Sequence, residues 1–170
     1  MIFEIPWYVI LFQTLPETFI LIKLGLKIFN IDTKTKDILV ISSVISVLAY
    51  FIRKILYIVG ANLLFGIHTL LITLTTVILV HKKTKTTLSH SFISIFTSTL
   101  LDGVLQSVTA PIIFTIMKKN IEDLHLYPWL NILFFLPCGI IMLIIYLVIK
   151  KKKIYLLDLK LDSKDCDNIV

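Results

Sequence analysis

The chain has 170 residues, of which 57% are hydrophobic and only 16% are charged. Its mean hydropathy of +0.93 excludes an ordinary soluble domain, and five glycines and five prolines are too few for a barrel of many short strands. The net charge of +6 does not indicate a nucleic-acid partner, because the lysines cluster at the ends of apolar runs, where they anchor helices beside anionic lipid. We therefore expect an all-α integral membrane protein that lies in the lipid bilayer.

The apolar runs predict a bundle of about five transmembrane helices within residues 1–150. Most of these runs approach or exceed the roughly 20 residues that a helix needs to cross a bilayer. The expected spans are 5–29, 38–56, 58–80, 87–116 and 127–149, and residues 151–170 form a short cytoplasmic tail. Gly60, Asn62 and Gly66 leave open whether residues 53–66 are loop, re-entrant or helical. Pro111 is expected either to bend the fourth span or to end it early.

Lysine and arginine residues in the short loops predict the orientation. One side of the bundle collects ten of them, which are Lys27, Lys34, Lys36, Lys82, Lys83, Lys85 and Lys150 to Lys153. The other side collects four, which are Arg53, Lys54, Lys118 and Lys119. Because the richer side normally faces the cytoplasm, we expect a multi-pass cell-membrane protein with its N-terminus outside and its C-terminus in the cytoplasm.

Several polar residues interrupt the apolar runs at a similar depth. At a rise of about 1.5 Å per residue, Glu17, Arg53, His68 and Asp102 lie roughly 18 to 24 Å from the cytoplasmic ends of their helices. The helix-weakening Pro-Cys-Gly at 137–139 falls near the same layer. These residues therefore converge between the middle of the membrane and its outer leaflet.

A carboxylate facing lipid costs at least a few kcal/mol, so Glu17 is expected to face the bundle and to have a partner. Gln13 lies four residues earlier on the same helix face. Arg53 is the best counter-ion for Glu17 or Asp102, and His68 is expected at the edge of this charge cluster. These five residues are the predicted ligand-binding or buried polar set. The alternative is that they only bind helices together through hydrogen bonds.

Catalytic signals are weak, and we expect no enzymatic activity, no metal site and no cofactor. The chain has neither an H-E-x-x-H nor a G-x-S-x-G motif. His68 and Cys138 at one depth leave a Cys/His membrane peptidase as the remotest alternative. Such an enzyme needs the two residues close in sequence, which this chain lacks. We expect Cys138 to be a small filler at a bent helix.

Three segments carry a family resemblance: "LPETFILIKLGL" (15–26), "FGIHTLL" (65–71) and "YPWLNILFFLP" (127–137). Together they resemble the five-span membrane sensor region of Firmicutes, which occurs ahead of GHKL-type histidine kinase domains or alone. The resemblance implies that four residues match recurrent positions of that region, which are Glu17, Gly66, His68 and Trp129. This sequence has no kinase domain, so the resemblance implies a separate signalling partner.

The residues and the resemblance favour a non-enzymatic membrane sensor or accessory subunit. It would act with a separate cytoplasmic signalling partner, such as a histidine kinase or another membrane protein. The alternative is a component of a small-molecule transporter, in which Glu17 and Asp102 would be coupling or substrate-binding groups.

Overall fold

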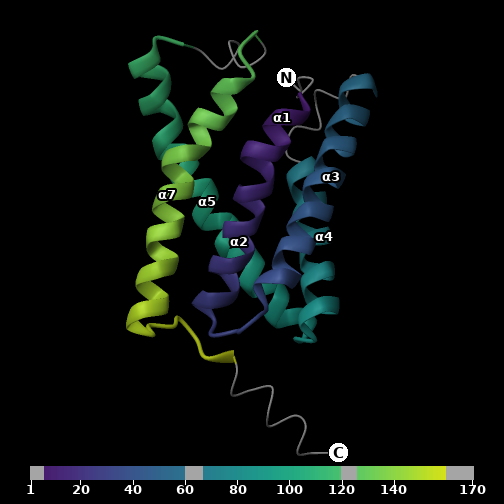
Figure 1. Cartoon of the computed structure of the whole chain (residues 1–170), viewed down its shortest axis with the longest axis vertical. Helices are drawn as coiled ribbons and strands as arrows, with labels where there is room; N and C mark the ends of the chain where they lie inside the picture. The colour runs from purple at the N-terminus through teal and green to yellow at the C-terminus, as the bar shows by residue number, and fades with distance from the viewer. Residues whose placement is uncertain (1–5, 60–66, 120–125, 160–170) are drawn as a thin grey trace, which may run out of the picture.

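The structure of this chain is a computed structural model that describes residues 6–59, 67–119 and 126–159 (Figure 1). Every regular element within those ranges is helical. The elements are α1 (Trp7–Val9), η1 (Ile10–Thr14), α2 (Leu15–Ile28), α3 (Thr35–Val59), α4 (Ile67–Thr84), α5 (Leu88–Met117) and α7 (Trp129–Lys152). The segments α1, η1 and α2 follow one another without a break and form one helix.

Four helices are long and apolar enough to cross a membrane, so the fold is that of a helical membrane protein. They are Trp7–Ile28, Thr35–Ile58, Leu88–Met117 and Trp129–Lys152. Helix α4 has 18 described residues and is not among the four, because its last turn holds His81, Lys82 and Lys83. It nevertheless packs between α3 and α5 along the bundle (Figure 1). The count of five spans therefore stays a prediction.

The helix boundaries answer one question that the sequence left open and part of another. Residues 53–59 continue α3 as regular helix, while residues 60–66 lie outside the described part of the chain. Helix α5 runs through Pro111 and ends only at Met117, so Pro111 does not end it early. The Thr115 hydroxyl donates to the Pro111 carbonyl at 2.8 Å, as other hydroxyl side chains of these helices do to the carbonyl four residues earlier.

The first helix contains a π-helical segment, η1, directly before Pro16. The Leu15 amide donates to the Ile10 carbonyl, five residues back instead of four. Pro16 has no amide hydrogen and its ring crowds the carbonyl four residues earlier, so a wider turn relieves the clash at this point. This segment carries Gln13 and leads directly to Glu17, so the irregular backbone lies beside the predicted polar cluster.

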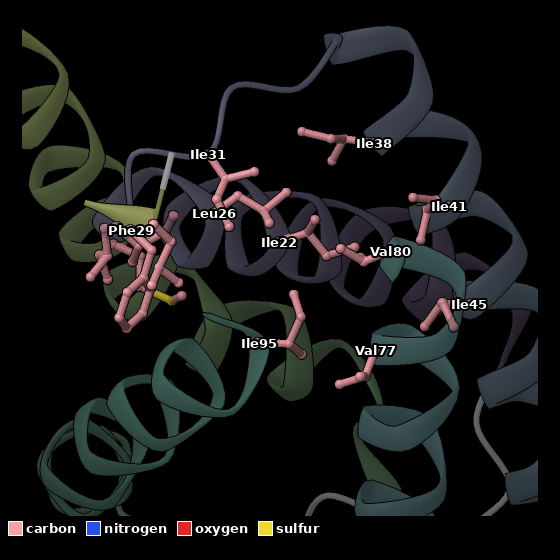
Figure 2. Close-up of a cluster of buried hydrophobic side chains, with 14 residues drawn as sticks. Ile22, Leu26, Phe29, Ile31, Ile38, Ile41, Ile45, Val77, Val80 and Ile95 are labelled. Atoms are coloured by element: carbon pink, nitrogen blue, oxygen red, sulfur yellow. The ribbon is translucent and has the colours of Figure 1, made fainter. Parts of the chain in front are cut away.

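The main apolar core lies at the end of the bundle from which the C-terminal segment leaves (Figure 1). Its members come from the end of α2, the start of α3, the end of α4, the start of α5 and the end of α7. Figure 2 shows side chains of this core, among them Ile22, Ile38, Ile45, Val80 and Ile95, converging between these helices. Van der Waals packing of such branched side chains holds helices together where lipid offers no hydrophobic driving force. One end of the bundle is therefore closely packed.

Large apolar side chains cover the outside of the helices. Among them Ile58 is 72% exposed and Ile116 is 74% exposed within the chain. Exposed apolar surface of this extent marks a contact with lipid or protein. The outward residues of α3, α5 and α7 thus fit a lipid environment.

The segment after α7 folds back onto the end of α2. The amides of Leu156 and Leu159 donate to the carbonyls of Ile28 and Phe29 at 2.9 and 3.3 Å. The Leu159 side chain is buried in the apolar core. Helix α2 leaves its last carbonyls without intrahelical partners, and this segment satisfies one of them together with the following Phe29 carbonyl. The start of the predicted tail is therefore part of the folded bundle.

Candidate functional site

Helix α5 presents a stripe of small polar side chains toward α2. Ser91, Ser94, Ser98 and Asp102 follow one another at spacings of three and four residues, and all four are buried. Such spacing places them on one helix face. At Gly25 of α2 this face comes so close that an added Cβ would lie 2.5 Å from the Ser94 carbonyl oxygen. Small residues thus allow the two helices to approach closely, as is usual in membranes.

The stripe ends at an acid pair, Glu17 and Asp102, whose two carboxyl groups are bridged by one amide. The Gln106 side-chain amide nitrogen donates to Glu17 Oε1 at 3.1 Å and to Asp102 Oδ2 at 2.8 Å. Gln13 adds a longer bond from its amide nitrogen to Glu17 Oε2 at 3.5 Å. The structure therefore brings together three of the five predicted site residues, Gln13, Glu17 and Asp102, from two helices.

Arg53 and His68 lie around this pair rather than in contact with it. Among the described residues, the ion pairs within 4 Å are Lys27–Asp32 and a long contact between Lys83 and Asp37, so Arg53 makes none with Glu17 or Asp102. Its charge still acts on the Glu17 carboxyl group and on the His68 ring at longer range. In the described structure the two carboxyl groups are thus joined by the Gln106 amide and not by a direct Arg53 contact.

His68 is half-buried near the start of α4, and its Nε2 lies 3.3 Å from the Thr69 hydroxyl. This interaction stays within one helix. The site is therefore built mainly by η1, α2 and α5, with Arg53 of α3 and His68 of α4 outside its hydrogen bonds.

Two buried acceptors of the site have no hydrogen-bond partner among the described residues. They are Asp102 Oδ1 and Gln13 Oε1. An unsatisfied buried acceptor costs about 1–3 kcal/mol, and lipid supplies no water to relieve it. The arrangement therefore offers two acceptors to an additional donor or cation.

Within the part of the chain that the structure describes, Cys138 contacts a hydroxyl group and not an imidazole. Its buried thiol lies 3.0 Å from the Thr109 hydroxyl, which joins α7 to the polar face of α5. A nucleophilic cysteine needs a base within hydrogen-bond reach, and the contacts described for this thiol include none. This geometry gives the peptidase alternative no support.

Gln106 is the site residue that the sequence reasoning did not single out. Its signal was the spacing of four from Asp102, which places the two side chains on one helix face. An amide among the apolar residues of α5 gave a second signal, because an amide within a membrane-spanning helix needs hydrogen-bond partners.

The chemistry open to this site is the binding of a proton, a small cation or a cationic group. In the described part of the chain no set of three or more His, Cys, Asp or Glu side chains is placed to hold a metal ion. Two carboxyl groups and two amides instead provide oxygen acceptors for a weakly held cation. Comparisons with protein-family models, with curated proteins and with solved structures find no match for this chain.

Proposed function

We propose that this chain is a non-enzymatic membrane sensor or accessory subunit that acts with a separate cytoplasmic signalling partner. The observation that carries the proposal is the position of α2. Near its start it holds Glu17 of the acid pair, and its last residue, Ile28, accepts the hydrogen bond from Leu156 of the C-terminal segment. One helix thus connects a polar site in the membrane to a surface at the opposite end.

The distance between these two points suits mechanical coupling. Eleven residues separate Glu17 from Ile28, which is about 16 Å of helix. A helix this short moves as a unit when one end is displaced. A ligand that changes the contacts of Glu17 would therefore alter how the C-terminal segment packs on the end of α2.

The C-terminal segment offers a surface for a partner. Ile154, Leu156 and Leu157 are exposed, and they follow directly after four consecutive lysines. Exposed leucines beside a basic run suit a partner helix at the membrane surface. The resemblance to a kinase-associated sensor region makes a histidine kinase the first partner to test.

The test is photo-cross-linking in the native membrane. A photoreactive residue at position 156 should give a discrete adduct with a partner, and one at the equally exposed Trp7 should not. Glu17→Gln should change the adduct yield at position 156 by at least about fivefold, the lower end of allosteric coupling. An unchanged yield in Glu17→Gln, or no adduct at position 156, would reject the sensor proposal.

A transporter component is the second candidate, and the two unsatisfied acceptors beside the acid pair favour it. Coupling ions and protons commonly use such intramembrane carboxyl groups. The full chain in liposomes should then carry an ion flux that Glu17→Gln abolishes. Absence of flux together with the cross-linking result above would assign the acid pair to sensing.

A further inference from the structure

The donors of the acid pair are fully used. Both hydrogens of the Gln106 amide are needed for its bonds to Glu17 and Asp102, and these bonds share one nitrogen atom. The two accepting oxygens are therefore no farther apart than the sum of the two bond lengths. Gln13 contributes only the 3.5 Å bond, which is at the limit of a hydrogen bond.

The acceptors exceed the donors. Asp102 is only 7% exposed, yet its Oδ1 has no partner in the described structure, and the same holds for the buried Gln13 Oε1. The second oxygen belongs to a neutral amide on the first helix, four residues before Glu17. In total the two carboxyl groups and the Gln13 amide present five oxygens.

Among the described residues, the charges around the pair leave one negative charge unmatched. Arg53 of α3 is the cation whose charge acts on Glu17, without an ion pair within 4 Å. His68 of α4 lies near that Arg53, and Cys138 of α7 lies near both acids. Two carboxylates against one guanidinium give a net charge of minus one in a region surrounded by lipid. Placing such a charge in a membrane is costly unless it is neutralised.

We propose that the Glu17–Asp102 pair is a binding site for one monovalent cation, taken up against the free oxygens of Asp102 and Gln13. A proton and Na⁺ share the required chemistry. A proton on one carboxyl group supplies the missing donor and removes the excess charge. Na⁺ is bound by the oxygen ligands that the site offers. In both cases a single positive charge neutralises the net charge of minus one. A divalent ion beside Arg53 would instead leave a net charge of plus one.

This inference takes the acid pair to be the ligand site of the proposed function, but it does not depend on coupling to the C-terminal segment. Its experiment therefore uses the purified full chain in nanodiscs, without any partner. Failure of the cross-linking test would reject sensing and leave the cation site in place. Failure of the test below would reject the cation site and leave the cross-linking result in place.

The proton arm uses infrared spectroscopy in Na⁺-free buffer at neutral pH. The carbonyl band of a protonated carboxyl group should be present in the wild type. It should be lost or shifted in both Glu17→Gln and Asp102→Asn. It should persist in Asp37→Asn, which changes an acid at the far end of the bundle.

The sodium arm uses thermal unfolding in NaCl against choline chloride at equal ionic strength. Stabilisation by bound Na⁺ should raise Tm by about 2–4 °C for each kcal/mol of binding energy. The rise should vanish in Asp102→Asn and remain in Asp37→Asn. A protonated-carboxyl band without a rise in Tm in NaCl identifies the bound cation as a proton. A rise in Tm in NaCl identifies it as Na⁺. The absence of both, or an effect that Asp102→Asn retains, would overturn the proposal.

Discussion

Gly25 of α2 lies against Ser98 of α5 so closely that a Cβ at Gly25 would be 2.7 Å from the Ser98 hydroxyl oxygen. Glu17 lies eight residues before Gly25 on α2, and Gln106 lies eight residues after Ser98 on α5. These two side chains are joined by a hydrogen bond. The equal spacing on two antiparallel helices means that one register sets both contacts. The close approach at Gly25 therefore helps to place the acid pair about 12 Å away along the helix.

Gly25→Ala should destabilise the protein by about 1–3 kcal/mol, as overpacking does, because the added methyl group also meets the Ser94 backbone oxygen. Backbone cannot yield as a side chain can, so adding Ser98→Ala should restore little. Gly103→Ala on α5 is the control, since a Cβ there has nothing within 4 Å. It should be neutral or stabilising by up to about 1 kcal/mol. Thermal unfolding in detergent measures all three, and equal effects of Gly25→Ala and Gly103→Ala would contradict the close packing.

Gln106→Leu should destabilise the protein by about 1–3 kcal/mol, because it removes both hydrogen bonds to the acids and leaves the carboxyl groups facing each other. Adding Asp102→Asn should recover part of the loss, since it removes one of the two charges. Gln13→Leu is the matched control and should cost less, because its bond to Glu17 is 3.5 Å long. Additive effects of Gln106→Leu and Asp102→Asn in a double-mutant cycle would show that the two residues do not interact.

Leu159→Ala should destabilise the bundle by about 2 kcal/mol or more, because the side chain is buried in the apolar core. Leu157→Ala, two residues earlier and exposed, should be nearly neutral. Limited proteolysis after residue 153 should accelerate in Leu159→Ala and stay slow in Leu157→Ala. Similar cleavage rates in the two variants would mean that the segment does not depend on its Leu159 contact.

Cys138→Ala should leave both expression and any cross-linking activity near the wild-type level. The thiol is a small buried group whose partner is the Thr109 hydroxyl. The free energy of unfolding should fall by about 1 kcal/mol. Adding Thr109→Val to Cys138→Ala should recover part of this loss, because replacing both partners leaves neither group unpaired. Full loss of activity with normal folding would instead revive the peptidase alternative.

Reporter fusions should place the C-terminus and positions 35 and 84 in the cytoplasm, and position 121 outside. The reason is the ten-to-four distribution of lysine and arginine between the two ends. The structure places the turn at 29–34, the turn at 85–87 and the end of α7 at the same end of the bundle (Figure 1). An external reading from the C-terminal fusion would contradict both the orientation and the count of five spans.

The sequence by itself determined the class of the protein, which is a helical membrane protein. Hydropathy and run length are local properties, so they predicted α5 at 87–116 against the observed Leu88–Met117. They also placed Glu17 and Asp102 at similar depth, because depth depends only on the number of residues from a helix end.

Only the tertiary structure decided which polar side chains meet at that depth. Contact depends on the rotation of each helix about its axis and on which helices are neighbours, and residue numbers fix neither. Gly25 and the serines of α5 turn α5 toward α2, so the amide of Gln106, and not the guanidinium of Arg53, joins Glu17 to Asp102. The contact of Leu159 with the end of α2 is likewise formed between residues far apart in the sequence. It forms because the free carbonyls at the end of α2 lie within reach of the segment after α7.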